Sequence, residues 1–197
     1  MVTHLLAWLA AVLGALLLSV VALVAFTPHD HKVELVVSWP STPPTRIWQL
    51  LTQHADEPRW VTFFASVKRQ PDDQGRPVWA YRDATGSFSA TMMTILAVPE
   101  SRYERILLRE PGAGRDAWDV RWVIELEPAG SGARMRFTEY GWTGGFVFFL
   151  QQRIVGSPHR FPEQYVRSMG AALGDQPGSR SFEPISGMQG NPIPVRP

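Results

Sequence analysis

The spacing of strand-like segments between residues 66 and 141 restricts the fold more than any other feature of the sequence. Segments rich in β-branched and aromatic residues are separated by short runs of turn-forming residues such as DDQGRP, PES and EPAGSGA. The strands predicted from this pattern cover residues 66–71, 77–83, 87–98, 102–109, 117–127 and 133–141. A parallel pair of strands needs a crossover of a dozen or more residues, and these connections are too short for one. We therefore predict an antiparallel sheet.

Helices and one more strand are predicted on either side of this series. Residues 33–39, VELVVSW, predict a strand. A helix should follow, with Thr42 as its cap and Pro43 in its first turn, and then a short helix over residues 56–67. A long helix is predicted over residues 145–174, and the Gly-Ser-Pro sequence within it could interrupt it.

The two ends of the chain differ from the part between them. Residues 5–26 contain no charged residue and would form a helix about 33 Å long, enough to cross a hydrocarbon core of roughly 30 Å. The start, MVTH, has no Lys or Arg and the apolar run is long for a signal peptide, so residues 1–28 predict an uncleaved transmembrane anchor. Residues 176–197 are rich in Pro, Gly and Ser and predict a disordered tail.

The basic residues predict the orientation of this single-pass membrane protein. Lys32, Arg46 and Arg59 all follow the apolar segment, whereas only the α-amine and His4 precede it. Because basic residues favour the cytoplasmic side, the domain after the anchor is expected in the cytoplasm.

Composition and motifs exclude several classes of function. The net charge is +1 without a basic stripe, which argues against nucleic-acid binding, and the absence of cysteine excludes disulfides, thiolate metal sites and cysteine nucleophiles. The sequence HDH at 29–31 contains metal-ligand types, but three successive residues rarely converge on one ion. We predict no metal site, no cofactor and no catalytic residue. The acidic pair Asp56-Glu57 is interpreted as solvated or capping, and Arg105 and Arg109 as facing solvent.

Alternation within two strands predicts which side chains point inward. On strand 117–127, one face carries Trp118, Val120, Trp122, Ile124 and Leu126. On strand 133–141, Met135, Phe137 and Glu139 share a face, so Glu139 points inward if Phe137 does. A carboxylate there could accept hydrogen bonds from the start of the last helix, or it could act as a polar group that binds a ligand, or, less simply, as a base.

Three stretches resemble the START-like (SRPBCC, polyketide cyclase/dehydrase-like) superfamily over about residues 32–175. The first stretch, HKVELVVSWPSTPPTRIWQLLTQHADEPRW, resembles the opening of the superfamily's domain. The second, AWDVRWVIELEPAGSGARMRFTEYGWTGG, resembles the later strands of its bacterial members. The third, RIVGSPHRFPEQYVRSMGAALGD, resembles their closing helix. Many relatives have Asn-Pro-x-x-Arg where this chain has TGGFVFFLQQR, so Arg153 would replace the arginine without the Asn-Pro pair.

The resemblance implies an α+β helix-grip fold, in which a curved antiparallel sheet of about seven strands surrounds the long C-terminal helix. It also implies a bacterial protein with a cavity between sheet and helix, and with the predicted anchor such a protein is expected in the bacterial inner membrane. The residues expected to line that cavity are Trp60, Phe63, Trp122, Phe137, Glu139, Phe149, Arg153 and Tyr165.

Three functions fit these expectations. The first is membrane-anchored binding of an apolar small molecule, such as a lipid, a quinone or a polyketide-like compound, without chemical change. The second is an enzyme of the cyclase or aromatase kind, which needs an inward acid–base pair such as Glu139 with Arg153 or Tyr165. The third is an interaction domain with a filled core and no cavity. Fold alone does not choose among them.

Overall fold

The structure is a computed structural model that describes residues 2–26, 30–85, 89–108, 118–143, 160–175 and 179–182. Its centre is an eight-stranded sheet in the order β2-β3-β4-β5-β6-β7-β1-β8, and every neighbouring pair is antiparallel. The strands are β1 (Asp30–Trp39), β2 (Ser66–Asp73), β3 (Arg76–Arg82), β4 (Ser89–Val98), β5 (Arg102–Leu108), β6 (Trp118–Ala129), β7 (Gly132–Thr143) and β8 (Ser179–Phe182). The predicted antiparallel sheet of seven strands is thus confirmed, with β8 added at its edge.

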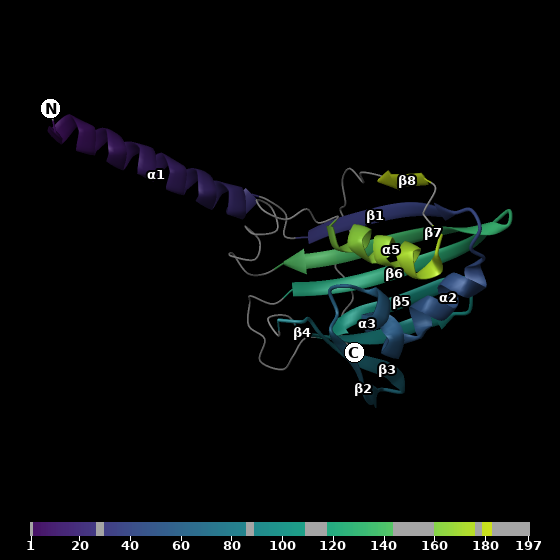
Figure 1. Ribbon diagram of the computed structural model, residues 1–197. Helices are drawn as coiled ribbons and strands as arrows, with labels where there is room; N and C mark the ends of the chain where they lie inside the picture. The colour runs from purple at the N-terminus through teal and green to yellow at the C-terminus, as the bar shows by residue number, and fades with distance from the viewer. Residues whose placement is uncertain are drawn as a thin grey trace.

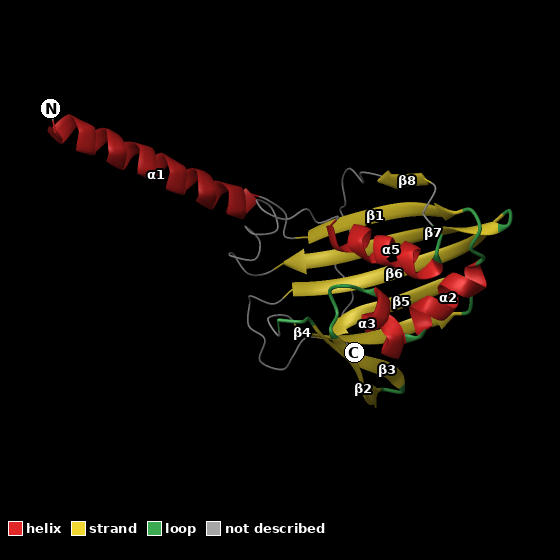
Figure 2. Cartoon of the chain, viewed as in Figure 1, coloured by secondary structure: helices red, strands yellow, loops and turns green. Residues whose placement is uncertain are grey.

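The helices other than α1 lie on one face of the sheet (Figures 1 and 2). They are α2 (Pro44–Thr52), the 3-10 turn η1 (His54–Asp56), α3 (Glu57–Trp60) and α5 (Arg160–Leu173), while α1 (Val2–Phe26) extends away from the sheet in the same view. The stripe of α5 that faces the sheet contains Tyr165, Val166 and Met169, each at most 1% exposed. Their spacing of one, three and four residues places them on one side of a helix, which explains why α5 packs there.

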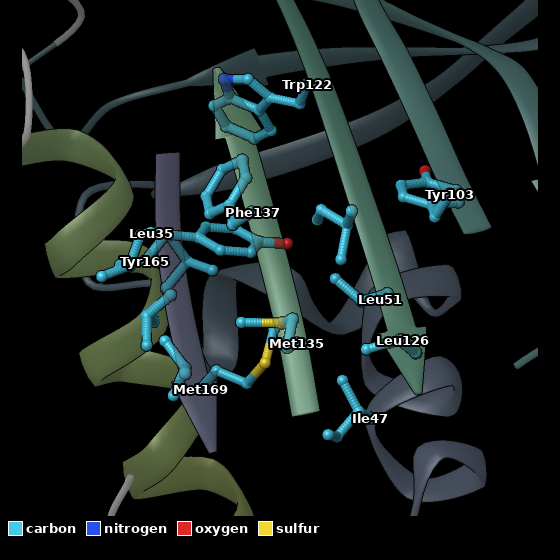
Figure 3. Close-up of a cluster of buried hydrophobic side chains, with 14 of the residues drawn as sticks. Leu35, Ile47, Leu51, Tyr103, Trp122, Leu126, Met135, Phe137, Tyr165 and Met169 are labelled. Atoms are coloured by element: carbon cyan, nitrogen blue, oxygen red, sulfur yellow. The ribbon is translucent and has the colours of Figure 1, made fainter. Parts of the chain in front are cut away.

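The core fills the space between the sheet and these helices. The predicted inward faces are confirmed where side chains are described: Val120, Trp122, Ile124 and Leu126 of β6 are buried, and so are Met135, Phe137 and Glu139 of β7. The side chain of Trp118 lies outside the described part of the chain. Figure 3 shows Trp122 and Phe137 from the sheet beside Tyr165 from α5. The rings of Phe137 and Tyr165 are 5.8 Å apart between centroids. Burial of these large side chains supplies most of the driving force that holds helices to sheet.

The helix boundaries differ from the sequence prediction at two places. Pro43 is the N-cap of α2 and Pro44 its first residue, and the Thr42 hydroxyl donates to Asp175 Oδ2 at 2.7 Å. The short helix predicted over 56–67 stops at Trp60, and β2 begins at Ser66. Of the long helix predicted over 145–174, the part over 160–173 is helical, and residues 144–159 lie outside the described residues.

The predicted disordered tail contains one ordered strand. Residues 179–182 form β8, which pairs with β1 in the register Leu35↔Phe182 to Ser38↔Ser179. The backbone of an edge strand offers free hydrogen-bonding groups whatever the sequence of its partner, and this is why composition did not predict the pairing. The rest of the tail lies outside the described residues.

Large apolar side chains of α1 are exposed. They include Trp8, Leu13, Leu17 and Leu18, each at least 68% exposed. Within the part of the chain whose side chains the structure describes, no helix has the combination of length and apolarity that crossing a membrane requires. The anchor over residues 1–28 and its orientation stay predictions.

Candidate polar site in the aromatic core

A buried ion pair between Glu57 and Arg105 lies in the middle of the core. Glu57, at the start of α3, is 0% exposed, and Arg105, in the centre of β5, is 1% exposed. Arg105 Nη1 donates to Glu57 Oε1 at 3.0 Å and to Oε2 at 3.3 Å. Glu57 was interpreted as solvated or capping and Arg105 as facing solvent, so the structure corrects both interpretations.

The correction follows from the alternation of β5. Tyr103, Arg105 and Leu107 occupy one face of this strand and all three are buried, so Arg105 points the same way as its apolar neighbours. Glu57 was interpreted as a carboxylate at the start of a helix, but the turn from η1 into α3 directs it inward to Arg105. Arg105 is 48 residues away, so the sequence does not show that the two are neighbours. A charged residue between two core residues of a strand is the signal that could have revealed the site.

Two tyrosines complete the shell of hydrogen bonds around the carboxylate. Tyr81, from β3, donates to Glu57 Oε2 at 2.6 Å, and Tyr165, from α5, donates to Oε1 at 2.8 Å. The same hydroxyl oxygens accept from Arg105, since Nη1 is 3.0 Å from Tyr81 and Nη2 is 3.2 Å from Tyr165. Both Glu57 oxygens and both tyrosine hydroxyls are therefore paired within the cluster, which is the condition under which buried polar groups are stable.

His54 links this cluster to a second chain of hydrogen bonds. Its Nδ1 lies 3.3 Å from Glu57 Oε2 and 3.1 Å from the Tyr81 oxygen. A carboxylate only accepts, and the single Tyr81 hydrogen goes to Glu57, so Nδ1 must carry the proton. Nε2 then accepts from Tyr103 at 2.8 Å, and the Tyr103 oxygen accepts from Thr94 at 3.2 Å. The network thus assigns the histidine tautomer and a single direction to the chain.

The charges of the site are fixed by its surroundings. Burial alone would raise the pKa of Glu57, but the Arg105 guanidinium and the hydrogen bonds from His54 and Tyr81 outweigh it and hold that pKa at about 2. Burial lowers the pKa of His54 and raises the pKa of Tyr103 to about 12. At neutral pH the cluster therefore contains one anion, one cation, a neutral imidazole and neutral phenols.

Aromatic rings surround the guanidinium. Arg105 Cζ lies 4.3 Å from the Trp122 ring centroid and 5.5 Å from that of Tyr165, distances at which cation–π attraction is favourable. Trp60 packs on Tyr165 at 5.1 Å between ring centroids, and Phe161 on Trp122 at 4.9 Å. The result is a charged pair enclosed by aromatic side chains from the sheet, α3 and α5.

Glu139 belongs to a smaller cluster that shares Trp122. The Trp122 indole donates to Glu139 Oε2 at 2.8 Å, and His31 Nε2 lies 3.3 Å from Oε1. The His31 ring occupies the space above Gly141, where a Cβ atom would come within 2.0 Å of it, so glycine there leaves room for the ring. Glu139 thus holds the indole that stacks on Arg105. Its predicted contact with the start of the last helix lies outside the described residues.

The Trp122–Glu139 hydrogen bond gives a direct test of this arrangement. We expect Trp122→Phe to lower the free energy of unfolding by about 1–3 kcal/mol, because a buried carboxylate oxygen loses its donor. Urea unfolding of Trp122→Phe, Glu139→Ala and the double variant would measure the coupling between the two residues. Strictly additive losses would show that the two side chains do not interact.

The predicted cavity residues divide into four groups. Trp122, Phe137 and Tyr165 are buried in the core, and Trp60 and Phe63 pack against it half-buried. Glu139 is buried and points inward. Phe149 and Arg153 lie outside the described residues. That these residues line a ligand cavity stays a prediction. Sequence reasoning did not identify the central polar group, which comprises His54, Glu57, Tyr81, Tyr103 and Arg105.

Within the described ranges, four buried side-chain nitrogen atoms have no hydrogen-bond partner. They are Trp39 Nε1, Trp60 Nε1, Trp79 Nε1 and Arg105 Nε. The described residues also include no set of three or more His, Asp or Glu side chains arranged to hold a metal ion. The described interior therefore combines a carboxylate whose two oxygens are both paired with several unused N–H donors, one of which belongs to Arg105.

Comparison with known proteins reveals structural relatives only. No family model and no curated protein matches the sequence. A conserved Geobacillus kaustophilus protein superposes with a TM-score of 0.56 at 13% identity, covering 74% of this chain and 98% of its own. A Chromobacterium violaceum protein has a TM-score of 0.51 at 17% identity, with 75% and 98% covered. The di-domain ARO/CYC protein of the steffimycin biosynthetic pathway has 0.52 at 10%, with 73% and 50% covered.

The chain has the helix-grip fold. The expected α+β architecture is thereby confirmed, while identities this low carry no information about function. In this helix-grip domain the ionic centre lies between the sheet and the closing helix α5, because Arg105 comes from β5 and Tyr165 from α5.

Proposed function

We propose that this protein binds an apolar small molecule between the sheet and α5, with the Glu57–Arg105 pair as the polar centre of the site. The observation that carries the proposal is the complete burial of this ion pair among aromatic rings. Replacing a buried ion pair by well-packed apolar residues is often neutral or stabilising, so such a pair is weak evidence for a stability role. Aromatic walls with a few placed polar groups are instead typical of small-molecule sites.

The states of the groups favour binding over chemical conversion. Glu57 has both oxygens occupied and a pKa of about 2, which makes it a weak base near neutral pH. The Tyr81 and Tyr165 phenols are raised in pKa by burial, and His54 has both ring nitrogens engaged. These four groups thus offer no free acid or base for proton transfer, so we infer that the ligand is bound without chemical change.

The proposal can be tested on the full chain in mild detergent. Native mass spectrometry should detect a bound small molecule, and solvent extraction should identify it. The double variant Glu57→Leu/Arg105→Met should lose the ligand while remaining folded, and Arg134→Met, an exposed arginine of β7, should retain it. A ligand-free mass that persists after incubation with a membrane extract would contradict the proposal, as would full ligand retention by the double variant.

We also propose that residues 5–26 hold the domain at a membrane with the domain on the cytoplasmic side. The support is the absence of charge in this segment and the exposure of Trp8, Leu13 and Leu17. Such a location would let an apolar ligand reach the domain from the bilayer. Alkaline carbonate extraction of membranes should leave the protein in the pellet, and a chain lacking residues 1–28 should be released. Release of the full chain would refute the anchor, and protease cleavage from the periplasmic side would refute the orientation.

A further inference from the structure

The unused polar groups of the interior are all of one kind. Each of the four unpartnered buried side-chain atoms among the described residues is an N–H donor, three from indoles and one from Arg105. An N–H group buried without an acceptor is costly, and native interiors leave few of them. Their common chemistry indicates what is missing from this interior, namely hydrogen-bond acceptors.

Two of these donors border the same ring. The Trp60 indole packs on Tyr165 with 5.1 Å between centroids, and Arg105 Cζ lies 5.5 Å from the Tyr165 centroid. Arg105 also donates to the Tyr165 hydroxyl through Nη2, which leaves Nε as its unused donor. The Trp60 indole and the Arg105 guanidinium, which carry these two unused donors, therefore both lie against the same aromatic side chain of α5, next to the ion pair.

The acceptors of this region are already occupied. Glu57 Oε1 accepts from Arg105 and Tyr165, and Oε2 accepts from Tyr81 and His54. The Tyr81 and Tyr165 oxygens accept from Arg105. A ligand that brings a hydroxyl or amine would add a donor where acceptors are used up. A ligand that brings only acceptors would satisfy groups that now have no partner.

Charge excludes the strongest acceptors. Glu57 already neutralises Arg105, so a carboxylate or phosphate beside the pair would leave a net negative charge in a low-dielectric interior. A neutral carbonyl oxygen accepts hydrogen bonds without that penalty. Resting on the proposed function, we propose that the ligand carries a ketone- or quinone-type carbonyl on an apolar ring system, and that this oxygen accepts from Trp60 Nε1, Arg105 Nε or both.

A matched pair of probes isolates the carbonyl. Fluorene and 9-fluorenone have nearly the same shape and differ by CH₂ against C=O, and indane with 1-indanone is a smaller pair of the same kind. Equilibrium dialysis of the detergent-solubilised full chain, against protein-free detergent, would give the affinity of each probe. We expect the ketone of at least one pair to bind about tenfold or more tightly than its hydrocarbon, the ratio that one newly satisfied buried donor supports.

Variants assign the donor. Trp60→Phe should reduce the ketone-to-hydrocarbon ratio by about fivefold, and the ratio cancels any change in affinity that the two probes share. Trp79→Phe removes another unpartnered indole N–H, but that ring packs on His54 at 4.9 Å, so the ratio should not change. As a second readout, the carbonyl stretch of bound 9-fluorenone should move to lower wavenumber in infrared difference spectra, and less so in Trp60→Phe.

The outcomes separate the inference from the proposed function. Equal affinity for ketone and hydrocarbon, with an unshifted carbonyl stretch, would overturn the carbonyl inference and leave ligand binding intact. A ketone preference that is the same in Trp60→Phe, with the stretch still shifted, would assign the hydrogen bond to Arg105 Nε alone and so support the inference. Binding of neither probe pair, together with a ligand-free native mass, would overturn both.

Discussion

Arg105→Met is expected to destabilise the folded domain by about 3–5 kcal/mol, because it leaves the Glu57 carboxylate buried without its cation. The loss should exceed that of an ordinary core substitution, since the two tyrosine hydroxyls that accept from Arg105 lose their donor as well. Urea unfolding followed by far-ultraviolet circular dichroism measures it. The exposed Arg134→Met is the matched control and should change stability by less than about 0.5 kcal/mol.

The double variant Glu57→Leu/Arg105→Met should recover part of this loss. Removing both charges eliminates the uncompensated carboxylate, although Tyr81 and Tyr165 keep unsatisfied hydroxyls and prevent full recovery. If the double variant lost more free energy of unfolding than the two single variants together, the ion pair would not be the interaction that stabilises this region.

Acidification is expected to lower the free energy of unfolding over two pH ranges, one set by His54 and the other by Glu57. In the folded state burial lowers the pKa of His54, so the unfolded chain binds a proton more readily than the folded one and stability falls as the pH drops below about 6.5. For Glu57 the folded pKa of about 2 lies below the ordinary value of 4.5. Its contribution is therefore complete above about pH 5 and is lost as the pH falls from there toward 2.

The contribution of Glu57 has a magnitude that follows from its pKa. A difference of this size between the folded and unfolded pKa of Glu57 corresponds to roughly 3 kcal/mol. Glu57→Gln should flatten the stability profile between pH 5 and 2, whereas Glu127→Gln, an exposed substitution on β6, should not. A profile of Glu57→Gln that keeps the full acid slope would show that other carboxylates carry it.

The sequence predicted the sheet and its inward faces because both depend on short-range patterns. Alternation within 117–127 placed Trp122 in the core, and the turn sequences separated the strands correctly to within a few residues. The same reasoning placed Glu139 inward, although its partners His31 and Trp122 come from other strands and could not be inferred from spacing.

The polar centre was not predicted because Arg105 and Glu57 were assigned to the surface from their charge and not from their places in the strand and helix patterns. Arg105 lies between Tyr103 and Leu107 on one strand face, a position typical of a buried side chain, but it was interpreted as facing solvent because arginine generally prefers water. The preference fails when a carboxylate is brought to the same place, and Glu57 is 48 residues away in sequence. Pairings across such distances depend on tertiary structure, which is also why the β1–β8 pairing was not foreseen.

The edge strands of the sheet limit its pairing with strands of other chains. In the described sheet the outermost strands are β8, only four residues long, and β2, which carries Lys68, Arg69 and Pro71. Short length, basic side chains and a proline without an N–H each oppose the addition of a foreign strand. By folding its own tail along β1, the chain occupies a backbone ladder that would otherwise recruit another copy. Protection against fibril-like self-association is thus provided by residues that composition alone would assign to a dispensable tail.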